Sequence, residues 1–170
     1  MCKYNISPFT PGSLTLVAAR PGMGMLDYMC AHASARLRSH KLLFLTDCTS
    51  HLQIKKRIGV DLLPNLIIVD TVADDLDGEL NHIKTLCDEN GFSTVIVEPR
   101  KGFYDLTRLK KLSQELHIEI VVGERIASWH DCPGTPEAPA INDVQTPGVE
   151  SIDNFIALHR PEFYKPRCRN

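Results

Sequence analysis

A short apolar run followed by a turn of small residues is the part of this chain whose residue types could do chemistry. The run covers residues 14–18, the turn covers residues 19–24, and a stretch that favours helix follows from about Leu26. A strand, a glycine-rich turn and a helix in this order gather backbone N–H groups and the positive end of the helix dipole around one point. The spacing therefore predicts a loop that can hold the oxygens of a phosphate group.

The turn lacks the two side chains that a catalytic phosphate-binding loop uses. In the pattern G-x-x-x-x-G-K-[ST], the lysine reaches the β- and γ-phosphates and the hydroxyl residue binds Mg²⁺. Here Met25 and Leu26 follow Gly24. A thioether and an isobutyl group can supply neither function. The sequence thus predicts the backbone of a nucleotide site without its charged and metal-binding groups.

Two distant segments resemble one protein family. Residues 17–24 read VAARPGMG and resemble the phosphate-binding loop of DnaB-type replicative helicases, a RecA-fold family of superfamily 4. Residues 158–164 read LHRPEFY and resemble the strand and the Arg-Pro-Glu-Tyr-Tyr-like segment near the end of that family's motor domain. The segments stand in the family's order, and the resemblance covers residues 12–164. It implies a RecA-like P-loop α/β fold, in a shortened and degenerate member.

The resemblance also assigns roles to individual positions. The residues that it places against nucleotide or phosphate are Arg20, Pro21, Gly22, Met23, Gly24, Met25, Leu26 and Arg125. Asp47 falls where the family has a glutamate that polarises the attacking water, and it is one methylene shorter. Glu98 falls at the Walker B position, where the family has an aspartate that reaches Mg²⁺ through water. Arg125 falls where the helicases have a glutamine that senses the γ-phosphate.

Each of these positions also has a purely structural interpretation. The glycines can serve a tight strand-to-helix turn, and Asp47 can be a helix cap or an ordinary loop residue. Glu98 can pair with Arg100 or Arg125 as a buried carboxylate. Asp27 places a negative charge in the first turn of the following helix, where it complements the helix dipole without any ligand.

Apolar runs alternate with helical segments along the rest of the chain. The expected strands cover residues 14–18, 41–46, 66–69, 94–97, 118–122 and 154–158. The expected helices cover residues 26–38, 50–58, 75–89 and 105–116, with Asp74 or Asp75 capping the third and Asp105 the fourth. Residues 123–148 contain several prolines and are expected to form a loop. The alternation is typical of a parallel sheet with helices on both faces, whose ligands bind at the carboxyl ends of the strands.

Size and composition favour one globular domain over residues 1–170, with a basic C-terminal tail at residues 165–170. The chain is 43% hydrophobic and 24% charged, and it contains neither a signal-peptide pattern nor an apolar run of membrane-spanning length. A cytoplasmic protein without a membrane partner is therefore expected. The net charge of −2 is not typical of a dedicated nucleic-acid-binding protein, although clusters of basic residues keep DNA as a candidate partner. The cysteines and histidines lack metal-site spacing, so no metal site is predicted.

Three functions follow as hypotheses. The first is a non-catalytic binding module that docks on a related helicase subunit, on a second copy of itself, or on DNA. The second is an ATP-dependent helicase or ATPase with weak nucleotide binding, in which a lysine such as Lys101 replaces the missing one. The third is a binder of another anionic small molecule in the phosphate cradle. The candidate ligands are ATP, ADP, phosphate or sulfate, and the missing hydroxyl argues against Mg²⁺.

Overall fold

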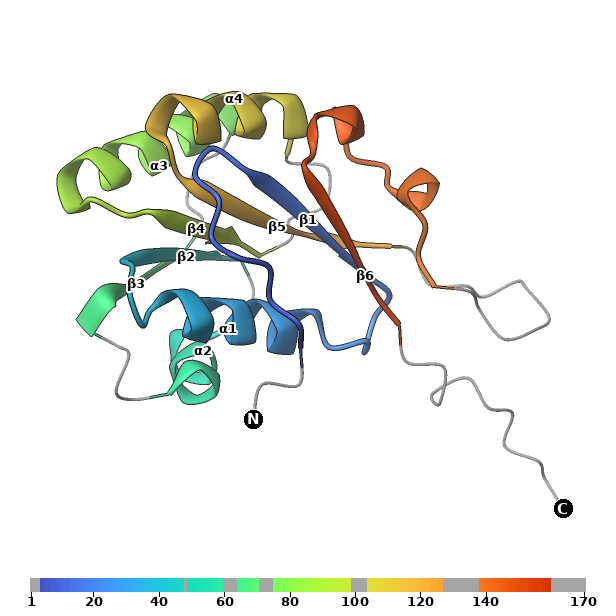
Figure 1. Ribbon diagram of the computed structural model, residues 1–170, viewed down its shortest axis with the longest axis horizontal. Helices are drawn as coiled ribbons and strands as arrows, with labels where there is room; N and C mark the ends of the chain where they lie inside the picture. The colour runs from blue at the N-terminus through green and yellow to red at the C-terminus, as the bar shows by residue number, and fades with distance from the viewer. Residues whose placement is uncertain are drawn as a thin grey trace, which may run out of the picture.

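The computed structural model describes residues 4–47, 49–59, 64–70, 75–98, 104–126 and 138–159. Within these residues the chain forms a twisted sheet between layers of helices (Figure 1). The strands are β1 (Leu14–Ala19), β2 (Leu42–Thr46), β3 (Leu66–Asp70), β4 (Thr94–Val97), β5 (Glu119–Arg125) and β6 (Asn154–Leu158). They lie in the order β3-β2-β4-β5-β1-β6, and each neighbouring pair is parallel. The expected α/β fold with a parallel sheet is confirmed.

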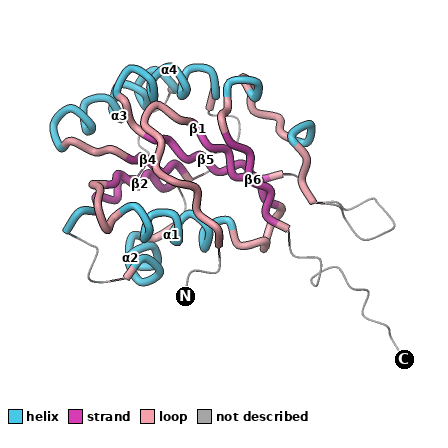
Figure 2. The backbone as a smooth tube through the Cα atoms, viewed as in Figure 1, coloured by secondary structure: helices cyan, strands magenta, loops and turns pink. Residues whose placement is uncertain are grey.

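Helices cover both faces of this sheet (Figures 1 and 2). Helices α1 (Met25–Arg36) and α2 (His51–Ile58) lie on one face, and α3 (Leu76–Asn90) and α4 (Leu106–Leu116) lie on the other. Neighbouring residues of one strand enter different cores: Val17 packs with the α1 and α2 side chains, whereas Leu16 packs with those of α3 and α4. Since successive side chains point to opposite faces, a strand covered on both faces is buried along its length.

The caps of α3 and α4 agree with the sequence prediction. Asp75 Oδ1 accepts a 2.7 Å hydrogen bond from the Gly78 amide, and Asp105 Oδ1 accepts one of 2.9 Å from the Thr107 amide. Gly91 follows α3 with φ 68°, in the left-handed region that glycine adopts without strain. These local signals fix where both helices begin and where α3 ends.

Strand β5 is longer than its apolar run predicted. The parallel register pairs Ala19 with Arg125, so β5 continues three residues past the expected end at Val122. Residues 17–19 of the interior strand β1 pair with residues 123–125, and the ladder therefore continues. The prediction of a loop over residues 123–148 is therefore wrong at residues 123–125, which belong to β5. It is also wrong at Ile141–Asp143, which form a 3₁₀ turn.

Parts of the sequence-based expectations lie outside the described residues. These parts are Asp74, Arg100, Lys101, residues 127–137, the motif residues 160–164 and the tail at 165–170. Among the described helices, none has both the length and the apolar character needed to cross a bilayer.

Candidate functional site

The loop that the sequence singled out lies at the carboxyl edge of the sheet, between β1 and α1. Gly24 is the N-cap residue of α1 and has φ 89°, and Gly22 has φ 80°. Both values lie in the region that glycine favours, so the turn itself requires these residues. A Cβ added to Gly22 would meet no atom within 4 Å. The space above the loop is therefore open rather than packed.

A cavity of about 410 Å³ occupies this edge of the sheet. Its size is at the small end of the range for organic ligands, roughly 300–1,000 Å³. The lining residues are Ala19, Arg20, Pro21, Gly22, Met23, Gly24, Met25, Leu26, Asp27, Met29, Arg57, Glu98 and Arg125. The fold thus brings the loop residues, Glu98 and Arg125 around one space, although they lie far apart in the sequence.

Glu98 follows β4 and is only 3% exposed. The hydroxyls of Thr46 and Thr49 donate hydrogen bonds of 2.5 Å to its Oε2 and Oε1 atoms, respectively. Arg125 Nη2 lies 3.9 Å from Oε1, which is an ion pair but too long for a direct hydrogen bond. Both carboxylate oxygens are thus engaged by the protein itself. Binding a metal through Glu98 would require these contacts to break.

Asp47 is placed differently from Glu98. It is exposed at the end of β2 and is not among the residues that line the cavity. The N-cap of α2 is Ser50, whose side chain accepts a hydrogen bond from the Gln53 amide, so Asp47 does not cap that helix. Of the two carboxylates expected at a catalytic site, Glu98 accepts hydrogen bonds from two threonines, and Asp47 lies outside the lining of the cavity.

Arginine side chains supply the positive charge of the cavity. Arg20 is 4% exposed, whereas the Arg57 and Arg125 side chains are 41% and 58% exposed. Arg57 Nε donates a 3.1 Å hydrogen bond to Oδ1 of Asp27 in the first turn of α1. Among the described lining residues, the three arginines outnumber the two acidic residues, Asp27 and Glu98, by one. The N-terminus of α1 adds further positive potential.

Thioether and alkyl groups form the apolar part of the wall. Met23 and Met29 are buried in the core beneath the cavity, and the partly buried Met25 and Leu26 pack against the same core. The two positions that hold lysine and a hydroxyl residue in catalytic loops are therefore apolar and rest on the hydrophobic core.

Sequence reasoning missed Arg57 as a cavity residue. In the sequence it belongs to the basic run at residues 55–57, a pattern typical of a solvated helix face. It reaches the cavity because α2 packs beside α1, where Asp27 can pair with it. No local pattern specifies this packing. The acidic residue in the first turn of α1 is the one signal that could have suggested a basic neighbour.

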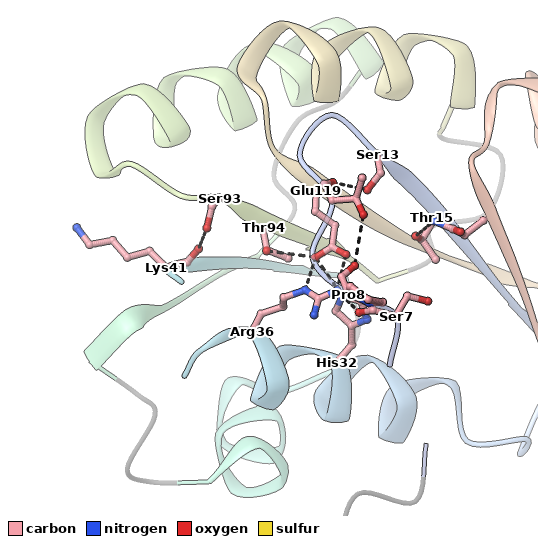
Figure 3. Close-up of polar contacts among 12 residues, drawn as sticks. Ser7, Pro8, Ser13, Thr15, His32, Arg36, Lys41, Ser93, Thr94 and Glu119 are labelled. Atoms are coloured by element: carbon pink, nitrogen blue, oxygen red, sulfur yellow. Dashed lines mark hydrogen bonds and ion pairs between the residues drawn. The ribbon is translucent and has the colours of Figure 1, made fainter. Parts of the chain in front are cut away.

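A second buried polar cluster lies at the opposite, amino edge of the sheet (Figure 3). Arg36 donates to the Glu119 carboxylate through Nε at 2.6 Å and Nη2 at 2.7 Å, and His32 Nε2 lies 3.2 Å from it. Burial opposes ionisation of Glu119, but the hydrogen bonds from Arg36 and His32 outweigh burial and lower its pKa to about 2. Arg36 also donates to the Ser7 carbonyl at 2.7 Å. The cluster fastens α1 to β5 and to the N-terminal segment.

A scan against protein-family models finds no match to this chain, and a search of curated proteins finds no similar protein. The helicase resemblance therefore rests on the motifs at residues 17–24 and 158–164. The all-parallel α/β sheet is consistent with that resemblance at the level of fold class.

Proposed function

We propose that this chain is a non-catalytic, DnaB-helicase-like binding module that acts in DNA replication by docking on a related motor subunit or on a second copy of itself. The observation that carries the proposal is the engagement of Glu98. Its carboxylate oxygens accept hydrogen bonds of 2.5 Å from Thr46 and Thr49. A carboxylate held in this way is not placed to hold a metal-bound water.

Residues at other positions also argue against ATP hydrolysis, each at a different step of the reaction. Met25 leaves the charge of the β- and γ-phosphates uncompensated, and Leu26 cannot bind Mg²⁺. Asp47 is exposed and lies outside the cavity lining, so it is poorly placed to orient an attacking water. Because these losses affect different steps, compensation at one of them would not restore hydrolysis.

The surface beside the cavity supports docking. Motor domains of the resembled family assemble through edges next to the nucleotide site. Helix α2 borders the cavity through Arg57, and its Leu52 is 76% exposed. Exposed basic residues at 55–57 accompany Leu52 on this short helix. An apolar anchor with charged neighbours suits an interface that has an apolar centre and a polar rim.

The test combines a turnover assay with light scattering. The purified chain should release no phosphate from Mg-ATP and separate no DNA strands, and it should associate with itself or with the motor domain of a DnaB-type helicase. Leu52→Ser should weaken this association roughly tenfold, as expected when a buried apolar anchor is lost. The matched control is Ile141→Ser, which changes another exposed apolar residue, 42% exposed, on a 3₁₀ turn.

Two results would contradict the proposal. One is Mg-dependent turnover that survives size-exclusion purification and disappears in Asp47→Ala. The other is a chain that stays monomeric in the presence of the motor domain.

A further inference from the structure

The cavity over residues 19–27 combines guanidinium groups with an apolar wall, and this combination suits a ligand other than Mg-ATP. We propose that it binds a small organic phosphomonoester that carries an aromatic or similar apolar group, and that it does so without a metal ion. The inference rests on the proposed non-catalytic role of the same site and adds a ligand class to it.

The anionic end of such a ligand has donors from different elements. Arg57 comes from α2 and Arg125 ends β5, and both line the cavity with partly exposed side chains. The planar guanidinium fork matches the oxygens of a phosphate group in a bidentate manner. The first turn of α1 begins at Met25 and directs its backbone amides toward the same loop. These groups supply what the absent lysine would otherwise provide.

The apolar part of the ligand has a matching surface. Met25 and Leu26 are the partly buried members of the cavity wall, and Met23 and Met29 lie buried in the core beneath them. Methionine side chains adapt to the shape of a ligand, and their sulfur atoms make favourable contacts with aromatic rings. An inorganic phosphate would leave this wall in contact with water. An aromatic ester would cover it and gain the corresponding hydrophobic free energy.

The charge and chemistry of the lining also limit the ligand. Leu26 offers no metal ligand, and the Glu98 oxygens already accept hydrogen bonds from Thr46 and Thr49. The described lining has one net positive charge, counting its arginines against Asp27 and Glu98. A metal-free triphosphate would place far more negative charge in the cavity than these groups offset. A single phosphate group places much less negative charge there.

Calorimetric titration with phenyl phosphate, in EDTA and again with Mg²⁺, tests the inference. We expect the same affinity under both conditions, and binding of inorganic phosphate that is weaker by roughly fivefold or more, since the apolar contact is absent. Arg125→Gln should weaken phenyl phosphate binding by about tenfold, the effect of losing one charge-assisted contact. The matched control is Arg108→Gln on α4, which covers the opposite face of the sheet and should leave the affinity unchanged.

Met25→Glu provides a second variant, because it places a carboxylate in the cavity wall and leaves Arg125 intact. It should abolish binding while the thermal unfolding curve stays cooperative. Binding that requires Mg²⁺, equal affinity for inorganic and phenyl phosphate, or equal weakening in Arg108→Gln would overturn the inference. Turnover of Mg-ATP would refute the non-catalytic role and this inference with it. A chain without turnover that also fails to bind phenyl phosphate would refute the ligand class alone.

Discussion

The Thr46 hydroxyl donates a hydrogen bond of 2.5 Å to the Glu98 carboxylate at the carboxyl edge of the sheet. Strands β2 and β4 are parallel neighbours in which Leu45 pairs with Val97. Thr46 and Glu98, the residues that follow this pair, therefore lie side by side. Both side chains are buried. The contact ties the end of β2 to the residue after β4, and it engages the carboxylate that the helicase resemblance places at the Walker B position.

The first prediction is that Glu98 stabilises the fold. Glu98→Ala should lower the free energy of unfolding by about 2–3 kcal/mol, because the buried Thr46 hydroxyl and the partly buried Thr49 hydroxyl lose the carboxylate that accepts from them. Glu98→Gln should cost less, since an amide oxygen can still accept one of the hydrogen bonds. Urea unfolding measures both effects, with the exposed Glu89→Gln on α3 as control. Equal stability of the Ala variant and the control would show that the contact is dispensable.

The second prediction concerns repair of the loop. The double substitution Met25→Lys and Leu26→Thr should raise the affinity for a fluorescent ATP analogue roughly tenfold, because it restores a charge-assisted phosphate contact. Hydrolysis should stay undetectable in a phosphate-release assay, because Glu98 remains engaged by the threonines. The matched control exchanges the two residues, Met25→Leu with Leu26→Met. An unchanged affinity would mean that the loop is only a turn, and turnover would mean that Glu98 does not limit catalysis.

The elements with local signals were the predictable part of the fold. Asp105 caps α4 by accepting hydrogen bonds from the Thr107 and Arg108 amides. Gly91 ends α3 because its backbone has a positive φ. The buried strands are short apolar runs with turn residues at their ends. Such signals depend on a few neighbouring residues, and a sequence pattern can therefore find them.

The remaining features depend on contacts between distant segments. Strand β5 extends to Arg125 because β1 offers it a parallel partner, and Arg57 reaches the cavity because α2 packs beside α1. Arg36 and Glu119 are 83 residues apart in the sequence and form a buried pair. Their residue types are common on protein surfaces, and neither position has a local pattern that predicts burial.

The third prediction concerns thiol reactivity. Burial raises the pKa of the Cys30 and Cys87 thiols to about 12. At about pH 8 both should therefore stay protonated and react slowly with iodoacetamide in the folded chain. Peptide mass spectrometry should find both unmodified in buffer and both alkylated in urea, which serves as the matched control. Rapid alkylation of Cys30 in buffer would show that the segment next to the loop opens readily.

The fourth prediction compares two glycines with positive φ. Gly148 has φ 85°, and a Cβ added there would lie 2.5 Å from the backbone nitrogen of Thr107. Gly91 has φ 68°, and its added Cβ would meet open space. Gly91→Ala should therefore cost about 1 kcal/mol of backbone strain, whereas Gly148→Ala should cost several times as much because the start of α4 must move. Thermal unfolding of both variants checks this, and equal losses would contradict the close approach.

The last prediction follows from the lowered pKa of Glu119, which is about 2 in the fold against an ordinary 4.5. A carboxyl whose pKa is lower in the folded state stabilises that state above its unfolded pKa, and this contribution is lost as the pH falls from about 4.5 towards 2. Urea unfolding across this window should show stability falling with pH. Glu119→Gln leaves Arg36 without its buried carboxylate, so it should cost roughly 3 kcal/mol near neutral pH and flatten the profile. The exposed Glu89→Gln should keep the parental slope. A Glu119→Gln profile parallel to the parent would show that another group causes the acid sensitivity.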